Sequence, residues 1–451
     1  MLLNYTFEVV NLNVLKQVFK SPILKNDLVI KKMGKKITFC TYDAPLFHSV
    51  NSWLKRLLPS LSLNGFSISI LVFYEGPLED CETYKFFVDL GFRVKTFPFK
   101  SIAEEKIRWM LETLSEDPPD IFVPNMLVHA FFAASWLKRA GIPTIGVIHS
   151  DEQFYDGLVD VFVNGKQEFK VSAVVAVSRY LFNRINSQKP DEVVCRCIPC
   201  GVPISNVPVT SFTNPVFKLI YIGRLAEQQK RISEVVKAMC NASNKIEGVE
   251  GIIYGHGEDK KVISLIKRYR AETKVKFGGS LSNKEIFNKL SKAQAFVLLS
   301  DYEGLPQSLL EAMACGLVPV CSDIKSGIPE LVIPNQTGVI VKDSDSSFVK
   351  AIQTLKDDPA FCQEISNNVK QKVIGYSMEV CTESWVNLLN EMLINADITK
   401  PIEIPATFEL PKPHRDLKRE DFRTPTISDN FLHAVRKTKI FHLVKKLVSP
   451  N

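Results

Sequence analysis

Two carboxylates, Glu303 and Glu311, flank the predicted start of a helix that Pro306 opens. Gly304 stands just before this start, where the absence of a side chain allows a bound group to approach the backbone closely. The first amides of such a helix have no intrahelical acceptor and face the end of the predicted strand 295–299, so they form a ready anion site. These amides belong to Gln307, Ser308 and Leu309.

The two carboxylates suit hydroxyl groups that donate hydrogen bonds. Glu303 lies just before the helix and Glu311 about a turn and a half inside it. One can reach a sugar hydroxyl at the mouth of the site, and the other can accept both ribose hydroxyls deeper along the same face. The alternative is an amphipathic helix with two solvated glutamates. The surrounding Gly-Leu-Pro and Ala-Met-Ala-Cys-Gly sequences favour the binding site.

The composition is that of an ordinary globular protein. The chain has 451 residues, of which 45% are hydrophobic and 23% charged, and this length fits two α/β domains better than one. The formal net charge is +7 and the sequence pI about 8.7. This mildly basic balance suits an anionic substrate or an acidic membrane surface, and it falls short of the profile of a nucleic-acid binder.

The ends and the cysteines indicate a cytoplasmic protein. The start lacks a basic region followed by an apolar run, so we expect no signal peptide, and no apolar stretch reaches transmembrane length. The ten cysteines are irregularly spaced and predicted to be free thiols. Cys195, Cys197 and Cys200 form the one metal-like cluster, but no fourth ligand is near, so packing is favoured and no metal is expected.

Short β-rich runs alternate with helical stretches along most of the chain, which predicts βαβ units and parallel sheets. A seam rich in Pro, Ser, Thr and Asn, from Pro199 to Pro215, divides the series into two similar halves. Ligands of open parallel sheets bind beyond the carboxyl ends of the strands, so the cleft between the halves is the expected site. The predicted strands are 37–42, 66–73, 92–97, 121–124, 144–148, 173–177 and 193–198, then 217–222, 251–254, 275–277, 295–299, 318–321 and 338–341.

These patterns predict four segments. Residues 1–35 form an N-terminal extension, and residues 36–205 form a first Rossmann-like domain completed by a helix at 378–395. Residues 206–377 form the second domain. Residues 396–451 form a tail rich in proline and charge, expected to be extended or disordered as far as about residue 426. Its last part, 430–447, reads as a basic helix, either solvated or lying on an anionic membrane surface.

A second motif connects these residues to a known family. The segment Tyr221-Ile-Gly-Arg224-Leu-Ala-Glu-Gln-Gln-Lys230 and the spacing Glu303-x7-Glu311 resemble motifs of glycosyltransferase family 4. The resemblance implies the α/β GT-B fold, with two Rossmann-like parallel-sheet domains facing a central cleft. It also implies that Arg224 and Lys230 grip the diphosphate of a nucleotide-sugar donor, where fixed cations stabilise the charge of the departing diphosphate.

Further matches to the family extend over about residues 36–395. They imply catalytic roles for Arg224, Lys230, Glu303 and His149, with His149 hydrogen-bonding the donor sugar or shielding the forming cation rather than acting as a general base. On its own, a histidine at a strand end is more often structural. The donor-binding residues implied by the family are Gly223, Gly255, Gly257, Phe277, Gly304, Leu305, Pro306, Gln307, Ser308 and Glu311.

The acceptor side departs from the family pattern. Where the family has a Gly-Gly loop after its first strand, this chain has His48 and Ser49. Side chains restrict the approach to the backbone, which predicts a changed acceptor or a reduced activity. Asn51 and Ser52 remain to cap the following helix and offer its amides.

The resemblance implies a retaining hexosyltransferase that moves sugar from a UDP- or GDP-sugar to a glycan or lipid-linked acceptor in cell-envelope or extracellular polysaccharide synthesis. No cofactor beyond the donor is expected. The protein would lie in the cytoplasm or at the inner face of the plasma membrane. The alternative is a non-catalytic GT-B scaffold that binds a partner; another GT-B enzyme, such as a sugar-nucleotide epimerase or a phosphorylase, is disfavoured by Glu303-x7-Glu311.

Overall fold

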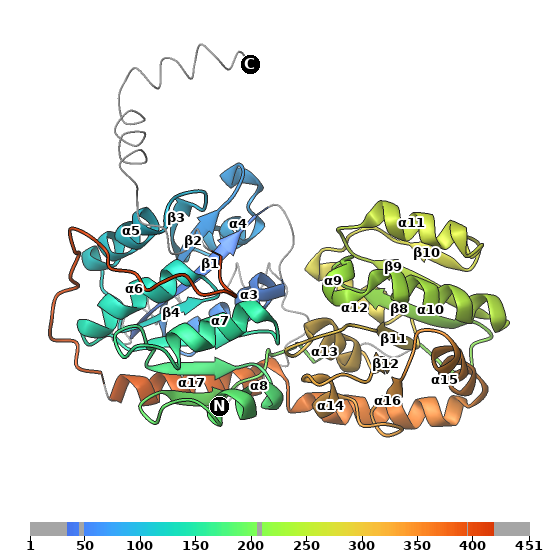
Figure 1. Cartoon of the computed structure of the whole chain (residues 1–451). Coiled ribbons are helices and arrows are strands. Elements are labelled where there is room, and N and C mark those ends of the chain that lie inside the picture. The colour runs from blue at the N-terminus through green and yellow to red at the C-terminus, as the bar shows by residue number, and fades with distance from the viewer. Residues whose placement is uncertain (1–33, 45–48, 205–209, 395, 419–451) are drawn as a thin grey trace, which may run out of the picture.

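The computed structural model describes residues 34–44, 49–204, 210–394 and 396–418. They form two open, fully parallel sheets, each in its own layered α/β unit (Figure 1). Each strand predicted from the sequence is present, within about two residues at either end. The strands are β1 Lys36–Asp43, β2 Ser67–Tyr74, β3 Arg93–Pro98, β4 Ile121–Asn125, β5 Thr144–Ile148, β6 Ala173–Ala176, β7 Val194–Cys197, β8 Phe217–Ile222, β9 Val249–Tyr254, β10 Val275–Phe277, β11 Ala295–Leu298, β12 Val318–Ser322 and β13 Val339–Val341.

Both sheets have the strand order of a doubly wound fold. The first runs β3-β2-β1-β4-β5-β6-β7 and the second β10-β9-β8-β11-β12-β13. In each sheet the winding reverses between the first and fourth strands, β1 beside β4 and β8 beside β11. Connections leave these two neighbours in opposite directions, so a crevice opens at their carboxyl ends and is the expected ligand site.

Helices connect the strands and bury apolar faces against the sheets. In the first unit they are α3 Ser49–Leu63, the 3-10 turn Leu78–Asp80, α4 Glu82–Asp89, α5 Ala103–Glu116, α6 Val128–Arg139, α7 Gln153–Phe162 and α8 Arg179–Asn186. In the second they are α9 Glu227–Lys230, α10 Ile232–Lys245, α11 Asp259–Arg268, α12 Asn283–Leu290, α13 Gln307–Ala314, α14 Ile328–Leu331, α15 Ser346–Asp357 and α16 Pro359–Ile374.

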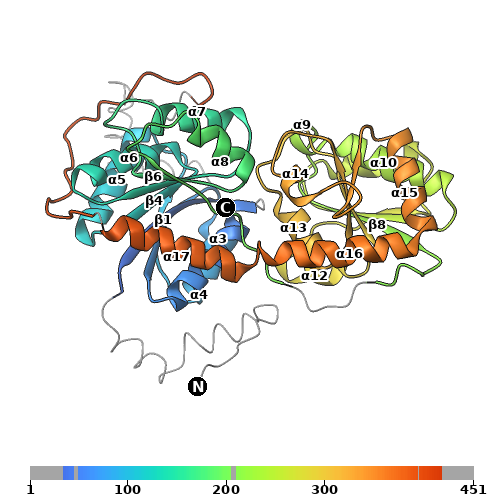
Figure 2. The same ribbon diagram turned by 90° about the horizontal axis from the view of Figure 1, so that it is seen from below.

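The chain crosses from the second unit back to the first between two long helices. Figure 2 shows α16 lying along the second unit and α17, Met378–Ile394, along the first. Trp385 of α17 is fully buried, with its ring 6.1 Å from Phe39 of β1 and 5.9 Å from Trp53 of α3. Helix α17 therefore packs into the core of the first unit.

Beyond α17 the chain continues as an extended strap, residues 396–418, over the surface of the first unit. Arg108 of α5 donates to the carbonyls of Pro405 and Ala406, at 3.0 and 2.8 Å. Phe408 is buried, with its ring 5.0 Å from Trp136 and 4.9 Å from the Arg108 guanidinium. Side-chain anchors thus hold a segment that has no helix or strand of its own.

Replacing Phe408 with alanine should loosen this strap. We expect a loss of about 3 kcal/mol in the stability of the first unit, because a buried ring and its contact with Arg108 disappear. Denaturant unfolding and limited proteolysis of residues 396–418 would measure it. Ile404→Ala is the control, since Ile404 is 37% exposed and its removal should cost less than about 1 kcal/mol. Equal proteolysis of the two variants would contradict the anchoring role.

The core of the first unit contains one histidine with a large expected effect on acid stability. His129 of α6 is 1% exposed, its ring lies 4.4 Å from Phe73, and both ring nitrogens are buried without hydrogen bonds in the described chain. Burial, and secondly the charge of Lys106, hold its pKa well below the usual value. The unfolded chain therefore binds the proton first, and stability is lost as the pH falls below about 6.5.

His129→Leu should remove this share of the acid sensitivity. Between pH 7 and pH 5 the stability of the variant should change by about 2 kcal/mol less than that of the parent, at roughly 1.4 kcal/mol per pH unit below 6.5. Urea unfolding at the two pH values would measure the difference. The same pH dependence in both proteins would show that His129 is protonated in the folded state.

Candidate active site

The sequence-predicted donor residues follow the strands at the reversal point of the second sheet. Gly223 and Arg224 come directly after β8, and the segment from Ser300 to Pro306 follows β11. Because β8 and β11 are paired neighbours, their two following loops meet. The topology alone therefore brings together groups that lie about eighty residues apart in sequence.

A buried amide joins the two loops. Gln229, in α9, accepts a hydrogen bond from Arg224 at its side-chain oxygen and donates at 3.2 Å from its nitrogen to the carbonyl of Tyr302. Its own carbonyl accepts from the amide of Asp301 at 2.9 Å. The hydroxyl of Tyr221 donates to the carbonyl of Arg224 at 2.7 Å. The Arg224 backbone and guanidinium are thus held from both sides while the residue stays exposed.

Lys230 and Glu303 form an ion pair at this junction. Their side chains are only 12% and 6% exposed. α9 ends at Lys230, because its C-cap residue Arg231 takes a left-handed conformation with φ 48°. This break aims the ammonium group back at the loop that follows β11. A mostly buried cation and anion therefore stand where the donor phosphates and sugar were predicted.

The Gly-x-Gly turn after β9 packs against the loop that carries Arg224. Gly255 and Gly257 have φ of 155° and 131°. A Cβ at Gly255 would stand 2.0 Å from the Gly223 carbonyl oxygen, and one at Gly257 would stand 2.7 Å from the carbonyl of Leu225. These glycines are required for packing under the Arg224 loop. Phe277 ends β10 on the same edge and is half-buried.

Helix α13 begins as predicted, with Pro306 as its N-cap and Gln307 as its first residue. One predicted feature is wrong: the amide of Leu309 donates to the Pro306 carbonyl at 3.1 Å, because the first turn tightens there, so it is not free for an anion. Leu305 is buried under this turn, and Ser308 is half-buried.

Glu311 lies inside α13 and is paired across the molecule. Its carboxylate accepts from Arg56 of α3, in the first unit, and the two side chains are 6% and 14% exposed. The other terminal nitrogen of Arg56 is buried without a hydrogen bond in the described residues. This arginine is not predictable from the sequence, because an isolated cation on a helix matches no motif spacing.

His149 directly follows β5 of the first unit and lies against the second unit. A Cβ on Gly304 would stand 2.0 Å from the His149 carbonyl oxygen, so only glycine allows this approach. The ring is edge-on to Trp53 at 4.9 Å, and its Nε2 lies 2.8 Å from Oδ1 of Asn125. Burial lowers the pKa of His149 to about 3, so the ring is uncharged at physiological pH.

Other contacts cross the same interface. Glu330 accepts at both carboxylate oxygens from the amide of Arg179, at 3.1 Å, at the start of α8. Glu152, at the start of α7, hydrogen-bonds Tyr302. Burial raises the pKa of Glu152, and the positive charge of Arg224 opposes this by a smaller amount. The structure therefore adds Glu152 and Tyr302 to the residues around Arg224. Like Arg56, they carry no recognisable sequence spacing.

The predicted acceptor-side residues fall at the start of α3. His48 lies outside the described residues, and Ser49 is the first residue of the helix. The prediction that Asn51 and Ser52 cap this helix is wrong, because both lie inside it. Asn51 instead accepts from the Thr41 hydroxyl at 2.7 Å and donates to the Tyr42 carbonyl at 2.9 Å. It fixes the end of β1 to the helix.

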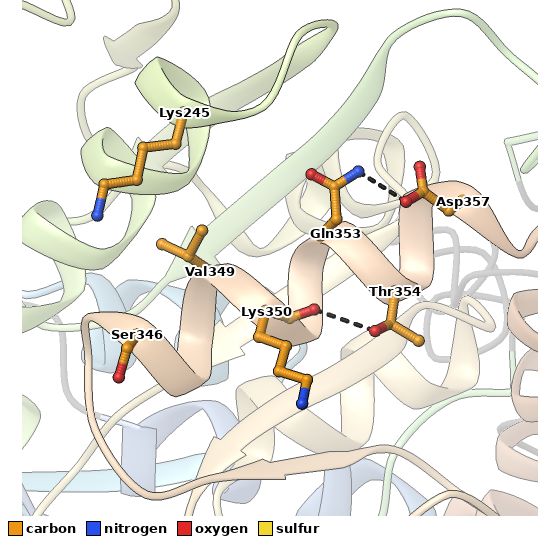
Figure 3. A pocket seen from close by; sticks show the side chains of 7 residues that line it. All are labelled: Lys245, Ser346, Val349, Lys350, Gln353, Thr354 and Asp357. Atoms are coloured by element: carbon orange, nitrogen blue, oxygen red, sulfur yellow. Dashed lines mark hydrogen bonds between the residues drawn. The ribbon is translucent and has the colours of Figure 1, made fainter.

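The pocket in Figure 3 lies elsewhere, between α10 and α15 on the side of the second unit away from the first. It is a shallow hollow of about 570 Å³, lined by Lys245, Ser346, Val349, Lys350, Gln353, Thr354 and Asp357. Its exposed aliphatic and lysine side chains show no convergent set of buried polar groups, so we do not place the active site there.

The described residues have three further properties. No three His, Cys, Asp or Glu side chains are grouped so as to hold a metal ion among them. Cys195 and Cys200 are buried, and each of the ten cysteines is a free thiol. In the part of the chain that the structure covers, none of the helices combines the length and apolarity needed to cross a membrane.

Solved structures share this architecture. The structure of Anabaena Alr3699/HepE in complex with UDP and glucose superposes with a TM-score of 0.64 and 19% identity, covering 79% of this chain and 100% of that one. Staphylococcus aureus TarM superposes with a TM-score of 0.62 and 16% identity, over 79% of this chain and 100% of the other. The chain has the two-domain GT-B fold predicted from its sequence.

The second unit also matches at the level of sequence. Residues 209–372 fit the family model described as "Glycosyl transferases group 1". The Mycobacterium tuberculosis glycogen synthase is 32% identical over 158 residues, 35% of this chain and 38% of that protein. The Bacillus anthracis N-acetyl-alpha-D-glucosaminyl L-malate synthase is 32% identical over 142 residues, 31% and 36% of the two chains. The chain thus matches little more than a third of each of these relatives.

Proposed function

We propose that this protein is a retaining glycosyltransferase that moves a hexose from a UDP- or GDP-sugar to a glycan or lipid-linked acceptor. The observation that carries the proposal is the placement of Arg224, Lys230, Glu303 and Glu311 on the segments that follow the paired strands β8 and β11, with His149 of the first unit against Gly304. The glycosyltransferase family match covers the same segment, and HepE, with the same fold, was solved with UDP and glucose.

In the proposed reaction the bond between the sugar C1 and the diphosphate oxygen breaks, and its electron pair goes to the diphosphate. Arg224 and Lys230 stabilise this growing negative charge, and since both are held in place beforehand they need little reorganisation. Glu303 accepts hydrogen bonds from the sugar, and Glu311 from the ribose. The acceptor hydroxyl attacks C1 from the face that the diphosphate leaves, which retains the configuration, and its proton passes to the departing diphosphate oxygen. Contact between the two domains excludes water from this step.

A donor panel tests the proposal. Thermal shift with UDP, GDP and their hexose conjugates identifies the base, because a ligand that binds the folded state raises the unfolding temperature. NMR of the products then detects slow donor hydrolysis or transfer and reports the anomeric configuration. Turnover with retention supports the proposal. Nucleotide binding without turnover across glycan and lipid-linked acceptors supports the scaffold alternative, and inversion refutes the retaining mechanism.

The proposed acceptor suits polysaccharide synthesis at the cytoplasmic face of a membrane. The basic segment 430–447 lies outside the described residues, so its membrane contact rests on its sequence. Deleting residues from 430 onward should weaken binding to anionic phosphatidylglycerol vesicles at low salt. Equal binding by full-length and truncated protein would remove the membrane from the proposal.

A further inference from the structure

Strand β4 ends in a bulge at Asn125. Along β4 and β5, Phe122 pairs with Thr144 but Asn125 pairs with Gly146, so β4 holds one extra residue there. Asn125 has φ 56° and is fully buried. Asparagine tolerates this left-handed conformation better than most residues. The bulge therefore gives the Asn125 side chain a different direction from the one it would have in a regular strand.

The surroundings of Asn125 fix which way its amide points. Its Nδ2 donates at 3.3 Å to the carbonyl of Cys40, and a carbonyl can only accept. Oδ1 therefore points the other way, to Nε2 of His149 at 2.8 Å. Since Oδ1 also can only accept, Nε2 must carry the proton. The Cys40 carbonyl of β1 thus determines, through a single amide, the tautomer of the histidine that follows β5.

The second ring nitrogen of His149 is left with a lone pair. In an uncharged imidazole with the proton on Nε2, Nδ1 is an acceptor. Among the described residues, no hydrogen bond reaches Nδ1. Nδ1 is also not one of the fully buried side-chain atoms that lack a partner. The ring is held by Trp53 at 4.9 Å and Tyr155 at 6.2 Å. The fixed acceptor is therefore open to a ligand at the domain interface, beside Gly304.

We propose that Asn125 is a positioning residue that sets donor specificity: it holds His149 with the proton on Nε2, so that Nδ1 accepts a hydroxyl of the donor sugar and rejects a carboxylate. The inference rests on the proposed function for its substrate. A sugar hydroxyl can donate to a lone pair, whereas a carboxylate at the same place has only lone pairs to offer. A hexose and its uronic acid differ only at C6, so the inference places C6 of the donor sugar at Nδ1, where the hexose hydroxyl is accepted and the carboxylate of the uronic acid is excluded.

The tautomer is tested without any substrate. In ¹⁵N NMR of histidine-labelled protein at pH 7, His149 should show a protonated Nε2 and an unprotonated Nδ1, assigned by the loss of its signals in His149→Gln. Asn125→Gly keeps the left-handed turn and removes the amide, so the His149 signals should become those of a tautomer mixture. Asn335→Gly is the control, because Asn335 also has a positive φ, 62°, and lies exposed in the second unit.

The specificity is tested with the nucleotide-hexose that the donor panel identifies and with its uronic acid. We expect Asn125→Gly to lower kcat/KM for the hexose about tenfold, as for one lost hydrogen bond, and to leave the uronic acid unchanged, so that discrimination narrows. Asn335→Gly should alter neither. A proton on Nδ1 in the parent, or an unchanged spectrum and unchanged discrimination in Asn125→Gly, would overturn the inference. If no donor is turned over, the proposed function fails, and the spectrum still decides the role of Asn125.

Discussion

Lys230→Met should lower kcat about 100- to 1,000-fold, the loss typical of removing one fixed group that stabilises transition-state charge. The substitution keeps most of the side-chain length and removes only the ammonium group. In the structure this group pairs with Glu303, and both are nearly buried. Transfer assays with the identified donor would measure the loss. A kcat within about threefold of the parent would show that Lys230 does not assist departure of the diphosphate.

The same variant leaves the Glu303 carboxylate buried without its partner. That loss alone costs stability, since an unpaired buried charge is unfavourable by several kcal/mol. The double variant Lys230→Met, Glu303→Gln separates the two effects: its stability should recover relative to the single variant, but its activity should not. If activity returned with stability, the lysine would serve folding and not catalysis.

Lys261→Met is the matched control on the same domain. Lys261 pairs with Glu227 at 2.7 Å and with Glu258 at 2.9 Å, but its side chain is 38% exposed. Water screens such a pair, so its removal should cost less than about 1 kcal/mol. We expect turnover close to that of the parent. The contrast with Lys230 would then come from position and not from the loss of a positive charge.

The fold was predictable because the hydrophobic period of each segment and the order of strands and helices can be read directly from the sequence. Each strand is a short apolar run bounded by turn residues, and alternation with helices permits few topologies. The donor residues are predictable for a related reason: Arg224 and Lys230 lie on the segment that follows β8, and Glu303 and Glu311 on the segment that follows β11. Motif spacing detects such residues, since each pair lies within one short segment of the sequence.

The remaining site residues come from elements that meet only after folding. Arg56 stands alone on α3, and nothing near it in sequence marks it as special. The segment from Asp120 to Asn125 resembles the family pattern, but the resemblance gives Asn125 no partner. The bulge that turns Asn125 toward His149 depends on pairing with β5, which is not written in the local pattern. The amide of Leu309 was misjudged for a similar reason, because the tightening of the first turn of α13 is a detail of backbone geometry.

The ion pair between Arg56 and Glu311 connects the two domains, and its variants should separate nucleotide binding from domain closure. Glu311→Ala should weaken binding of the identified nucleoside diphosphate about 10- to 100-fold, as for lost hydrogen bonds to a charged group. Its binding of the 2′-deoxy analogue should change much less, so the preference for ribose should collapse. Calorimetric Kd values for both nucleotides would measure it. A retained ribose preference would assign the ribose hydroxyls to another residue.

Arg56→Met should behave differently, because Arg56 belongs to the opposite domain. Glu311 stays in place to bind ribose, so the preference for ribose over deoxyribose should persist. The free protein, however, loses its charged contact across the interface, and its radius of gyration in X-ray scattering should rise until nucleotide is added. Ser52→Ala is the control, since the hydrogen bond between Ser52 and Asn283 across the same interface is long and weak, at 3.4–3.5 Å. An Arg56→Met variant that scatters like the parent would show that Glu330 and the Gly304–His149 contact close the domains without Arg56.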